Sequence, residues 1–254
     1  MKLVEYLKKY VALFLVILVC FVPFTAFAQK ESKELLVFAG AGMRLPLNKI
    51  GKKFEKKYKV KVIYDYEGSG RLGNKILVGQ TPDVFIPGSD RWAKIIKEKG
   101  CIKDYTPIAY HTPVIITPDG NMKVNSLVDF INNKNRIVLG DIKACAIGMV
   151  SAAIFKKADL KESKMNVKAR GVTVKQLVLW IEGNNADGSI VWKADAVQSG
   201  KVRIIDIPEQ YNFISIIPVC QMVRHKKETS QYVHYLLSAE GKGIFRKYGF
   251  EVAN

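Results

Sequence analysis

Residues 62–85 read VIYDYEGSGRLGNKILVGQTPDVF. They begin with alternating apolar and polar positions rich in β-branched and aromatic residues, the pattern of a strand. The strand runs into the turn Gly68-Ser69-Gly70, and a short helical segment then leads to Pro82-Asp83-Val84-Phe85. The glycines permit a sharp turn, while Ser69 places a hydroxyl beside the free N–H groups of the first helical turn. The stretch therefore predicts a strand, an anion-binding turn and a helix in succession.

The same stretch also fits the G-x-G-x-x-G pattern of dinucleotide-binding proteins, through Gly68, Gly70 and Gly73. Three features count against that function. The pattern lies outside the first β-α unit, no strand ends in an acidic residue about 20 positions later, and the chain begins with an export signal. We therefore expect no bound dinucleotide.

The first 28 residues have the composition of an export signal. Lysines at positions 2, 8 and 9 give a positive start, residues 11–24 are apolar, and Ala26-Phe27-Ala28 has the small-x-small pattern of a cleavage site. The apolar run is short for a membrane-spanning helix and contains Pro23, which argues against an anchor. Val19 precedes Cys20 where a lipoprotein signal has a small residue. We expect a soluble protein exported to the periplasm or extracellular face.

Charge and cysteine content narrow the class of protein further. The 254-residue chain has a net charge of +17, and without residues 1–28 the charge is still +15. Its lysines are spread along predicted helical faces, which is typical of solvated surface, so we expect no nucleic-acid partner. Cys101, Cys145 and Cys220 are far apart, so one disulfide is possible but its pairing stays open. No cysteine or histidine spacing indicates a metal site or a cofactor.

Further β-α units surround the glycine turn. Residues 34–39 form a buried-strand pattern before Gly40-Ala41-Gly42, and helical periodicity follows from Leu45 to Tyr58. Residues 83–86 form a third strand, after which Ser89 and Asp90 begin a helix over residues 91–99. Three such units imply a parallel sheet covered by helices.

The middle of the chain repeats this architecture, and its end differs. Two extended segments that contain prolines, 106–117 and 208–218, connect the parts. We predict an α/β fold of two lobes, each a mixed, mostly parallel sheet flanked by helices, with residues 29–112 and 218–254 in lobe 1 and residues 113–217 in lobe 2. Two crossovers form a hinge with a cleft between the lobes. The remaining predicted elements are helices over 127–132, 174–182, 231–238 and 241–248, a helix after Ala146, and strands over 136–139, 167–172, 188–192, 202–207 and 214–222.

Four places share one local pattern, in which a strand or loop ends in small residues and a helix begins. They are Ala41-Gly42, Gly68-Ser69-Gly70, Ala146-Ile147-Gly148 and Thr173-Val174. In a parallel α/β sheet such junctions lie at the carboxyl edge of the strands, so two facing lobes bring several helix N-termini to one cleft. Each N-terminus offers free N–H donors and about half a positive charge.

Several of these segments, in this order, resemble the periplasmic molybdate-binding proteins of ABC importers, which have the type 2 periplasmic-binding-protein fold. The resemblance covers nearly all of the chain that follows the export signal. The segments are Val37 to Gly42, Gly68-Ser69-Gly70, Pro82 to Ile86, Gly140-Asp141, Ser189 to Trp192, and the ending Ser238 to Gly241 with Tyr248-Gly249-Phe250.

The resemblance implies an oxyanion held between the lobes by donors from five positions. Ser69, Ile147 and Val174 match the family, the first through its hydroxyl and the others through backbone N–H groups. Gly42 stands where a serine is usual and so loses a hydroxyl, and Trp192 stands where a tyrosine is usual but still offers its indole N–H. The resemblance further implies a monomer that delivers molybdate or tungstate to a membrane permease.

The chemistry of the donors limits the ligand. Molybdate, tungstate and sulfate carry no proton near neutral pH and suit a site made of donors, whereas hydrogen phosphate needs an acceptor. Glu67 beside the turn would bring phosphate or a metal ion back into consideration if its side chain pointed inward. Arg44 and Arg71 are candidates for a charge-assisted contact, though solvated helix surface is the stronger interpretation for both.

Binding is favoured over catalysis. An enzyme would use Ser69 as a nucleophile, but the sequence around it is not G-x-S-x-G. No histidine follows a predicted strand end of either lobe, and only His111, near the hinge, stays open as a base. The other open alternative is a binding protein for a different anion, such as sulfate or phosphate, or for a metal complex.

The export signal gives the first testable prediction. We expect the mature protein to begin at Gln29, because Ala26-Phe27-Ala28 is the only good cleavage site after the apolar run. Intact-mass spectrometry of the exported protein measures this directly. A mass that retains residues 1–28, or a lipid on Cys20, would contradict it.

Overall fold

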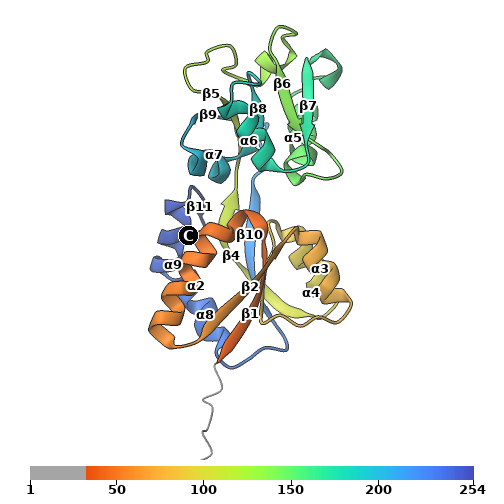
Figure 1. The fold of residues 1–254 in the computed structure, drawn as a ribbon. Helices are drawn as coiled ribbons and strands as arrows, with labels where there is room; N and C mark the ends of the chain where they lie inside the picture. The colour runs from red at the N-terminus through yellow and green to blue at the C-terminus, as the bar shows by residue number, and fades with distance from the viewer. Residues whose placement is uncertain (1–32) are drawn as a thin grey trace, which may run out of the picture. The chain divides into compact units, whose positions relative to one another are not determined.

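The computed structural model describes residues 33–254, which form one compact unit. The predicted export signal of residues 1–28 and its cleavage site lie outside the described residues. Within residues 33–254 the chain has the predicted α/β architecture, with mixed sheets flanked by helices (Figure 1). No helix in this part is long and apolar enough to cross a membrane.

Lobe 1 is built on a six-stranded mixed sheet. The strand order is β11-β4-β10-β3-β1-β2, with β1 in the interior and parallel to both β2 and β3. β10 is antiparallel to β3 and β4 on its two sides, and β11 is antiparallel to β4. The strands are β1 (Glu34–Gly40), β2 (Lys61–Glu67), β3 (Val84–Ile86), β4 (Ile102–His111), β10 (Ser215–Met222) and β11 (Glu251–Val252).

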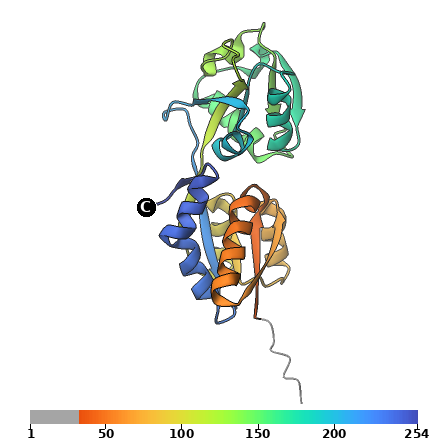
Figure 2. The same cartoon turned by 60° about the vertical axis from the view of Figure 1, so that its left-hand side comes forward.

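Helices cover both faces of this sheet (Figure 2). On one face lie α2 (Arg44–Tyr58), α8 (Thr229–Leu237) and α9 (Ala239–Lys247), with a core that includes Phe54 and Tyr232. On the other lie α3 (Ser69–Leu77) and α4 (Asp90–Glu98), whose core includes Leu72 and Phe85. The apolar side chains of each helix recur at helical spacing, so burial of that stripe against the sheet accounts for the predicted periodicity.

Lobe 2 has its own core, formed by residues between Val114 and Ile207. β5 (Pro113–Pro118) is antiparallel to both β8 (Ser189–Trp192) and β9 (Val202–Asp206). β6 (Ile137–Gly140) is parallel to β7 (Val167–Gly171), and a parallel bridge from Ile137 to Gly188 connects β6 to the start of β8. The helices of lobe 2 are α5 (Ala146–Lys157), α6 (Val174–Glu182) and α7 (Lys193–Ser199). Its short 3-10 helices are η2 (Leu127–Ile131) and η3 (Glu162–Lys164), and a third, η1 (Ala41–Met43), follows β1 in lobe 1.

The chain passes between the lobes in two short segments. β4 ends at His111 and β5 begins at Pro113, so a single residue, Thr112, separates the two strands. The return lies between Asp206 and Ser215. Both passages fall in the extended, proline-containing segments that the sequence indicates.

The structure differs from the predicted elements at several places, of which three bear on the fold. The helix expected over residues 127–132 is the 3-10 helix η2. The sequence analysis did not predict α7, whose seven residues bury only small alanines and end at Gly200, with φ of 65°. It also did not predict β11, because two residues carry no periodicity and the strand forms only by pairing with β4.

One glycine of the dinucleotide-like pattern has a packing explanation. A Cβ atom at Gly73 would lie 2.1 Å from the ring of Trp92, whereas one at Gly70 would make an ordinary contact with this ring at 3.5 Å, and one at Gly68 would meet no atom within 4 Å. Gly73 therefore allows α3 to approach α4 closely. Cys101, Cys145 and Cys220 are all free thiols, so the disulfide left open by the sequence does not form among them.

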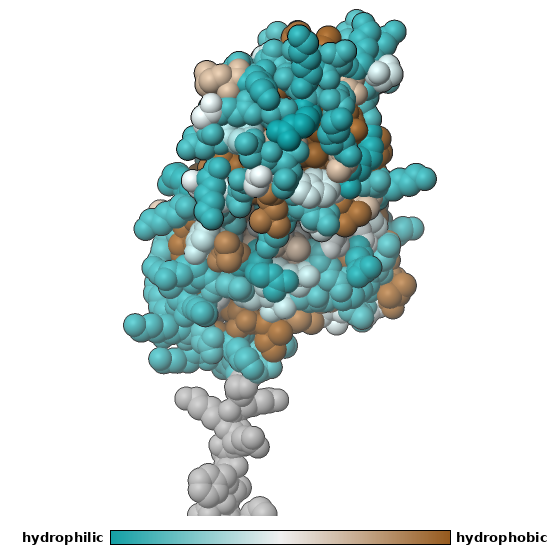
Figure 3. Space-filling view, turned by 45° about the horizontal axis from the view of Figure 1, so that its top comes forward, coloured by the Kyte–Doolittle hydropathy of each residue, from teal (hydrophilic) through white to brown (hydrophobic). Residues whose placement is uncertain are grey.

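Hydrophilic residues dominate the face shown in Figure 3, where apolar residues form separate patches. The most exposed apolar side chains, for example Val78, Met122 and Val128, lie in separate segments of the chain. Solvated charge of this kind agrees with the spacing of the lysines in the sequence.

Asp83 holds the beginning of β3 in lobe 1. Its side chain is buried, and its carboxylate accepts the backbone N–H groups of Leu36, at 2.8 Å, and of Lys226, at 2.9 Å. The hydroxyl of buried Thr229 lies 3.5 Å away. One carboxylate thus joins β1 and β3 to the start of α8.

We expect Asp83→Ala to lower the free energy of unfolding by about 2 to 4 kcal/mol, because each buried N–H left without an acceptor costs about 1 to 3 kcal/mol. Urea denaturation of the purified protein measures the change. Asp119→Ala, on an exposed loop, is the matched control and should change stability by less than about 0.5 kcal/mol. Equal effects at both positions would contradict the role given to Asp83.

Candidate functional site

In lobe 1, a candidate site residue lies just beyond the end of each of three parallel strands. In lobe 1, Gly42 follows β1, Ser69 follows β2 and Gly88 follows β3. The register pairs Gly40 with Glu67 and Ala39 with Ile86, so these parallel strands end at one edge of the sheet. Gly88 is a position that the sequence analysis did not single out.

Ser69 is the first residue of α3 and has one side of its hydroxyl engaged. Its Oγ accepts the backbone N–H of Gly88 at 2.9 Å. The N–H groups of Arg71 and Leu72 bond to the Gly68 carbonyl, while those of Ser69 and Gly70 belong to the helix start, where no intrahelical acceptor exists. Among the described residues the Ser69 hydroxyl hydrogen has no acceptor. The turn therefore presents several donors.

Gly88 connects Ser69 to the hinge. Its carbonyl oxygen lies 2.9 Å from Nδ1 of His111, the last residue of β4. The His111 ring stacks on Trp192, with ring centroids 4.8 Å apart and planes 19° from parallel. Two residues predicted for the site, Ser69 in lobe 1 and Trp192 in lobe 2, are thus joined through Gly88 and His111.

Ile147 and Val174 lie where the sequence predicts, at the starts of α5 and α6. The α6 N-terminus has a capping box, in which Thr173 accepts the Gln176 N–H and Gln176 accepts the N–H groups of Val172 and Thr173. The cap thus engages the N–H groups of Val172, Thr173 and Gln176, and the Val174 N–H takes no part in it.

Cys145 precedes the first turn of α5 and faces its donors. Burial raises the pKa of the Cys145 thiol, while the N–H groups of Ile147 and Gly148 act in the opposite direction. The Gly148 N–H itself bonds to the Cys145 carbonyl at 2.9 Å. The Cys145 side chain makes no cap hydrogen bond to this end of α5.

Asp195 is a carboxylate on α7, a helix that packs against α6. It is in the first turn of α7, three residues after Trp192. Burial raises the pKa of its carboxyl to about 6, and Lys175, the neighbour of Val174, lowers it. The carboxylate also raises the pKa of Cys145. Asp195 is a second residue missed by the sequence analysis, because α7 was not expected.

Gly42 is exposed, and the structure does not place it in contact with the other predicted site residues. No atom lies within 4 Å of the position that a Cβ would take there. Packing therefore does not require a glycine at this position, and the missing serine side chain leaves open space.

The charged candidates near the first two turns are engaged within lobe 1. The Arg44 guanidinium lies over the Tyr66 ring, 4.4 Å from its centroid. Glu67 lies 3.1 Å from Lys75 and 3.9 Å from Nε of Arg71, whose side chain is largely exposed. These contacts agree with surface roles for Arg44 and Arg71.

The arrangement gives little support to hydrolysis or metal binding. His111 bonds to the Gly88 carbonyl, and no hydrogen bond joins it to Ser69 in residues 33–254. The same part of the chain contains no group of three His, Cys, Asp or Glu side chains placed to hold a metal ion.

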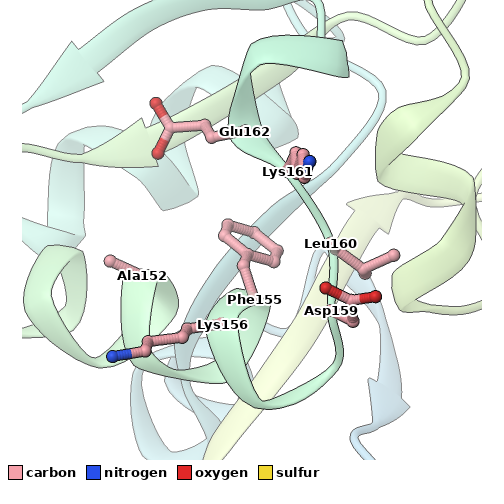
Figure 4. Close-up of a pocket in the computed structure, with 7 residues that line it drawn as sticks. All are labelled: Ala152, Phe155, Lys156, Asp159, Leu160, Lys161 and Glu162. Carbon is pink, nitrogen blue, oxygen red and sulfur yellow. The ribbon is translucent and has the colours of Figure 1, made fainter.

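A pocket of about 330 Å³ on lobe 2 is separate from the candidate site residues (Figure 4). Phe155 lies at its centre, and both lysines and acids surround it, among them Lys156, Asp159 and Glu162. It is at the carboxyl end of α5, where the helix dipole disfavours an anion. None of the five predicted site residues lines it.

Comparison with known proteins gives the family. The sequence profile described as bacterial extracellular solute-binding protein matches residues 35–251. YvgL of Bacillus subtilis, named as an ABC transporter substrate-binding lipoprotein, is 28% identical over 87% of both chains. The molybdate-binding protein ModA of Escherichia coli is 23% identical over 89% of this chain and 91% of its own.

Solved structures show the same fold. The substrate binding domain assigned to a molybdenum ABC transporter of Clostridium difficile has a TM-score of 0.77 and 23% identity, covering 88% of this chain and all of that one. Peb3 of Campylobacter jejuni, also solved with bound L-phospholactate, has a TM-score of 0.69 and 21% identity, covering 85% of this chain and 99% of its own. These likenesses confirm the two-lobed binding-protein architecture.

The burial of His111 generates a prediction on pH. Burial lowers its pKa to about 4 from 6.5, although the bond to Gly88 acts in the opposite direction. Between pH 6.5 and about 4 the unfolded chain binds a proton that the folded chain does not, so the free energy of unfolding falls as pH decreases through this range.

We expect the His111 Cε1 proton to titrate near pH 4 by NMR. We also expect the free energy of unfolding, measured by urea denaturation, to fall less between pH 6.5 and 4 in His111→Phe than in the parent. A resonance that titrates near pH 6.5 would show that the ring is solvated.

Proposed function

The chain belongs to the bacterial extracellular solute-binding proteins, and we propose that its solute is a tetrahedral oxyanion, molybdate or tungstate, delivered to the permease of an ABC importer. Members of this family bind and hand over solutes, so the protein is a binding protein rather than an enzyme. The oxyanion is the transported ligand, and the proposal needs no cofactor.

The observation that carries the proposal is the hydroxyl of Ser69. Its oxygen accepts the Gly88 N–H, so its hydrogen is available to a ligand at the start of α3. A site made of this hydrogen and of N–H groups at helix starts contains donors and positive dipole ends, which suit an anion without a proton. Ile147, Val174, the Gly42 N–H and the Trp192 indole are the other donors that we propose.

Capture would proceed by closure of the lobes. Ser69 and Gly42 are on lobe 1, whereas Ile147, Val174 and Trp192 are on lobe 2. One small anion satisfies all of these donors only when both sets approach it, so binding energy favours a closed form. We propose lobe 1 as residues 29–112 and 215–254 and lobe 2 as residues 113–214, because β10 of the lobe 1 sheet begins at Ser215. We also propose a monomer working outside the cytoplasmic membrane.

Asp195 favours a second candidate ligand. Asp195 is a carboxylate in the first turn of α7, which packs against α6, and a carboxylate is the acceptor that the hydrogen of a protonated phosphate requires. Phosphate or a phosphorylated small acid is therefore the alternative. Sulfate shares the chemistry of molybdate and is separated from it by cavity size.

The deciding experiment is isothermal titration of the exported protein with molybdate, tungstate, sulfate, phosphate and L-phospholactate in parallel. Tightest binding of molybdate or tungstate supports the proposal. Tightest binding of phosphate or L-phospholactate supports the alternative, and no binding of any of the five overturns the oxyanion class.

We expect Ser69→Ala to weaken molybdate binding by about 1.5 to 3 kcal/mol, the range for a hydrogen bond to a charged group. This corresponds to roughly ten- to hundredfold in Kd. Ser163→Ala, at an exposed position of η3, is the matched control and should leave Kd unchanged. If both variants bind molybdate as tightly as the parent, Ser69 does not touch the ligand.

A further inference from the structure

We propose that His111 is a positioning residue for ligand binding, which holds the Gly88 peptide that orients Ser69 and at the same time stacks on Trp192. This inference rests on the proposed function, because it takes Ser69 and Trp192 as ligand donors. His111 itself need not touch the ligand. It would set the geometry of one donor from each lobe.

The first step is the hydrogen on Nδ1. The Gly88 carbonyl can only accept, so the 2.9 Å contact requires that Nδ1 of His111 carries a hydrogen. The ring is neutral at pH 7, and its one hydrogen is therefore on Nδ1 rather than Nε2. The bond to Gly88 thereby fixes both the tautomer and the orientation of the ring.

The second step is the orientation of the Gly88 backbone. Its carbonyl accepts from His111 and its N–H donates to Ser69 Oγ, so the two bonds hold this residue from both sides. A Cβ at Gly88 would lie 3.2 Å from Cε1 of His111 and 3.6 Å from Ser69 Oγ. A side chain at position 88 would therefore press on the His111 ring, which would have to shift by a few tenths of an ångström. The Gly88 N–H occupies a lone pair of Ser69, and the hydroxyl hydrogen must point elsewhere.

The third step is the contact with lobe 2. The ring of Trp192 is nearly parallel to that of His111, and Phe250 lies on His111 as well, with centroids 5.8 Å apart. Charged groups also hold the adjoining crossover. Glu251 accepts from the Thr112 hydroxyl and pairs with Lys193, and the Lys193 N–H bonds to the Thr112 carbonyl. Trp192 is thus held between a stacked ring and a bonded backbone.

Two substitutions at position 111 separate the two contacts. His111→Phe keeps an aromatic ring for Trp192 but removes the donor to Gly88. His111→Asn keeps a donor near the position of Nδ1 but removes the ring. We expect each variant to bind the ligand found by titration about tenfold more weakly, and His111→Ala, which lacks both groups, more weakly than either.

The decisive test is the coupling between His111 and Ser69. If His111 acts through Ser69, His111→Phe should weaken binding about tenfold in the parent but less than about twofold in a Ser69→Ala background. Equal fold-changes in both backgrounds would overturn the positioning role, because a general loss of packing adds to the loss of the hydroxyl instead of replacing it.

A glycine pair gives a matched control. Gly88→Ala should also weaken binding, since its Cβ would press between His111 and Ser69. Gly243→Ala, in α9 where no atom lies within 4 Å of the new Cβ, should leave binding unchanged. Unaltered binding by Gly88→Ala would show that the spacing of Ser69 and His111 does not matter.

Measurements without ligand distinguish failure of this inference from failure of the proposed function. Amide hydrogen exchange of Gly88 by NMR should quicken in Ser69→Ala, and Gly88 and Ser69 resonances should shift in His111→Phe, whatever the protein binds. If none of the five anions binds but these changes occur, the linkage stands and the proposed function fails. If the Gly88 and Ser69 resonances are unaffected by His111→Phe, the inference is wrong even when molybdate binds.

Discussion

The parallel pairing of β1 with β2 and β3 is the constraint on which the candidate site depends. Because Gly40 lies opposite Glu67 and Ala39 opposite Ile86, three strands end together and release Gly42, Ser69 and Gly88 at one edge. β6, β7 and the bridge to Gly188 repeat the pattern in lobe 2 and release Ile147, Val174 and Trp192. The proposed donors are N–H groups at these ends, the Ser69 hydroxyl and the Trp192 indole, so the proposed anion site would need no lysine although the chain has a net charge of +17.

Local sequence patterns predicted most of the individual helices and strands of lobes 1 and 2. The helix from Val174 to Glu182 has the predicted bounds, because a capping box and an apolar stripe mark both its start and its face. The Gly88 and His111 contacts could not be predicted, since positions 69, 88 and 111 meet only through pairing of distant strands. Asp195 was missed for a related reason. Its helix is too short to show a period, and its environment comes from α5 and α6. The sequence thus placed the proposed donors at strand ends and helix starts, but it did not indicate Gly88, His111 or Asp195, which lie beside them.

The two departures from the molybdate-binding pattern have different physical meanings. At Gly42 nothing lies within 4 Å of the position of the absent side chain, so the proposed site would lose a donor and gain room. At Trp192 a larger aromatic ring is supported by His111, so its orientation is determined before any ligand arrives. In the proposed site, extra room at Gly42 and an oriented indole at Trp192 would suit anions larger than sulfate. Fit rather than charge would then separate such anions.

The interleaved order of the six-stranded sheet has a consequence for folding. β10 lies between β3 and β4 but is made after the whole of lobe 2, so lobe 1 cannot complete its sheet until the chain has emerged beyond Ser215. Lobe 2, by contrast, is continuous from Pro113 to Asp206 and pairs only with itself within its sheets. A nascent or translocating chain would therefore acquire lobe 2 first and would carry an open strand edge at β3 and β4 in the meantime. Chaperones that cover such strand edges should therefore assist the folding of residues 34–111 more than the folding of lobe 2.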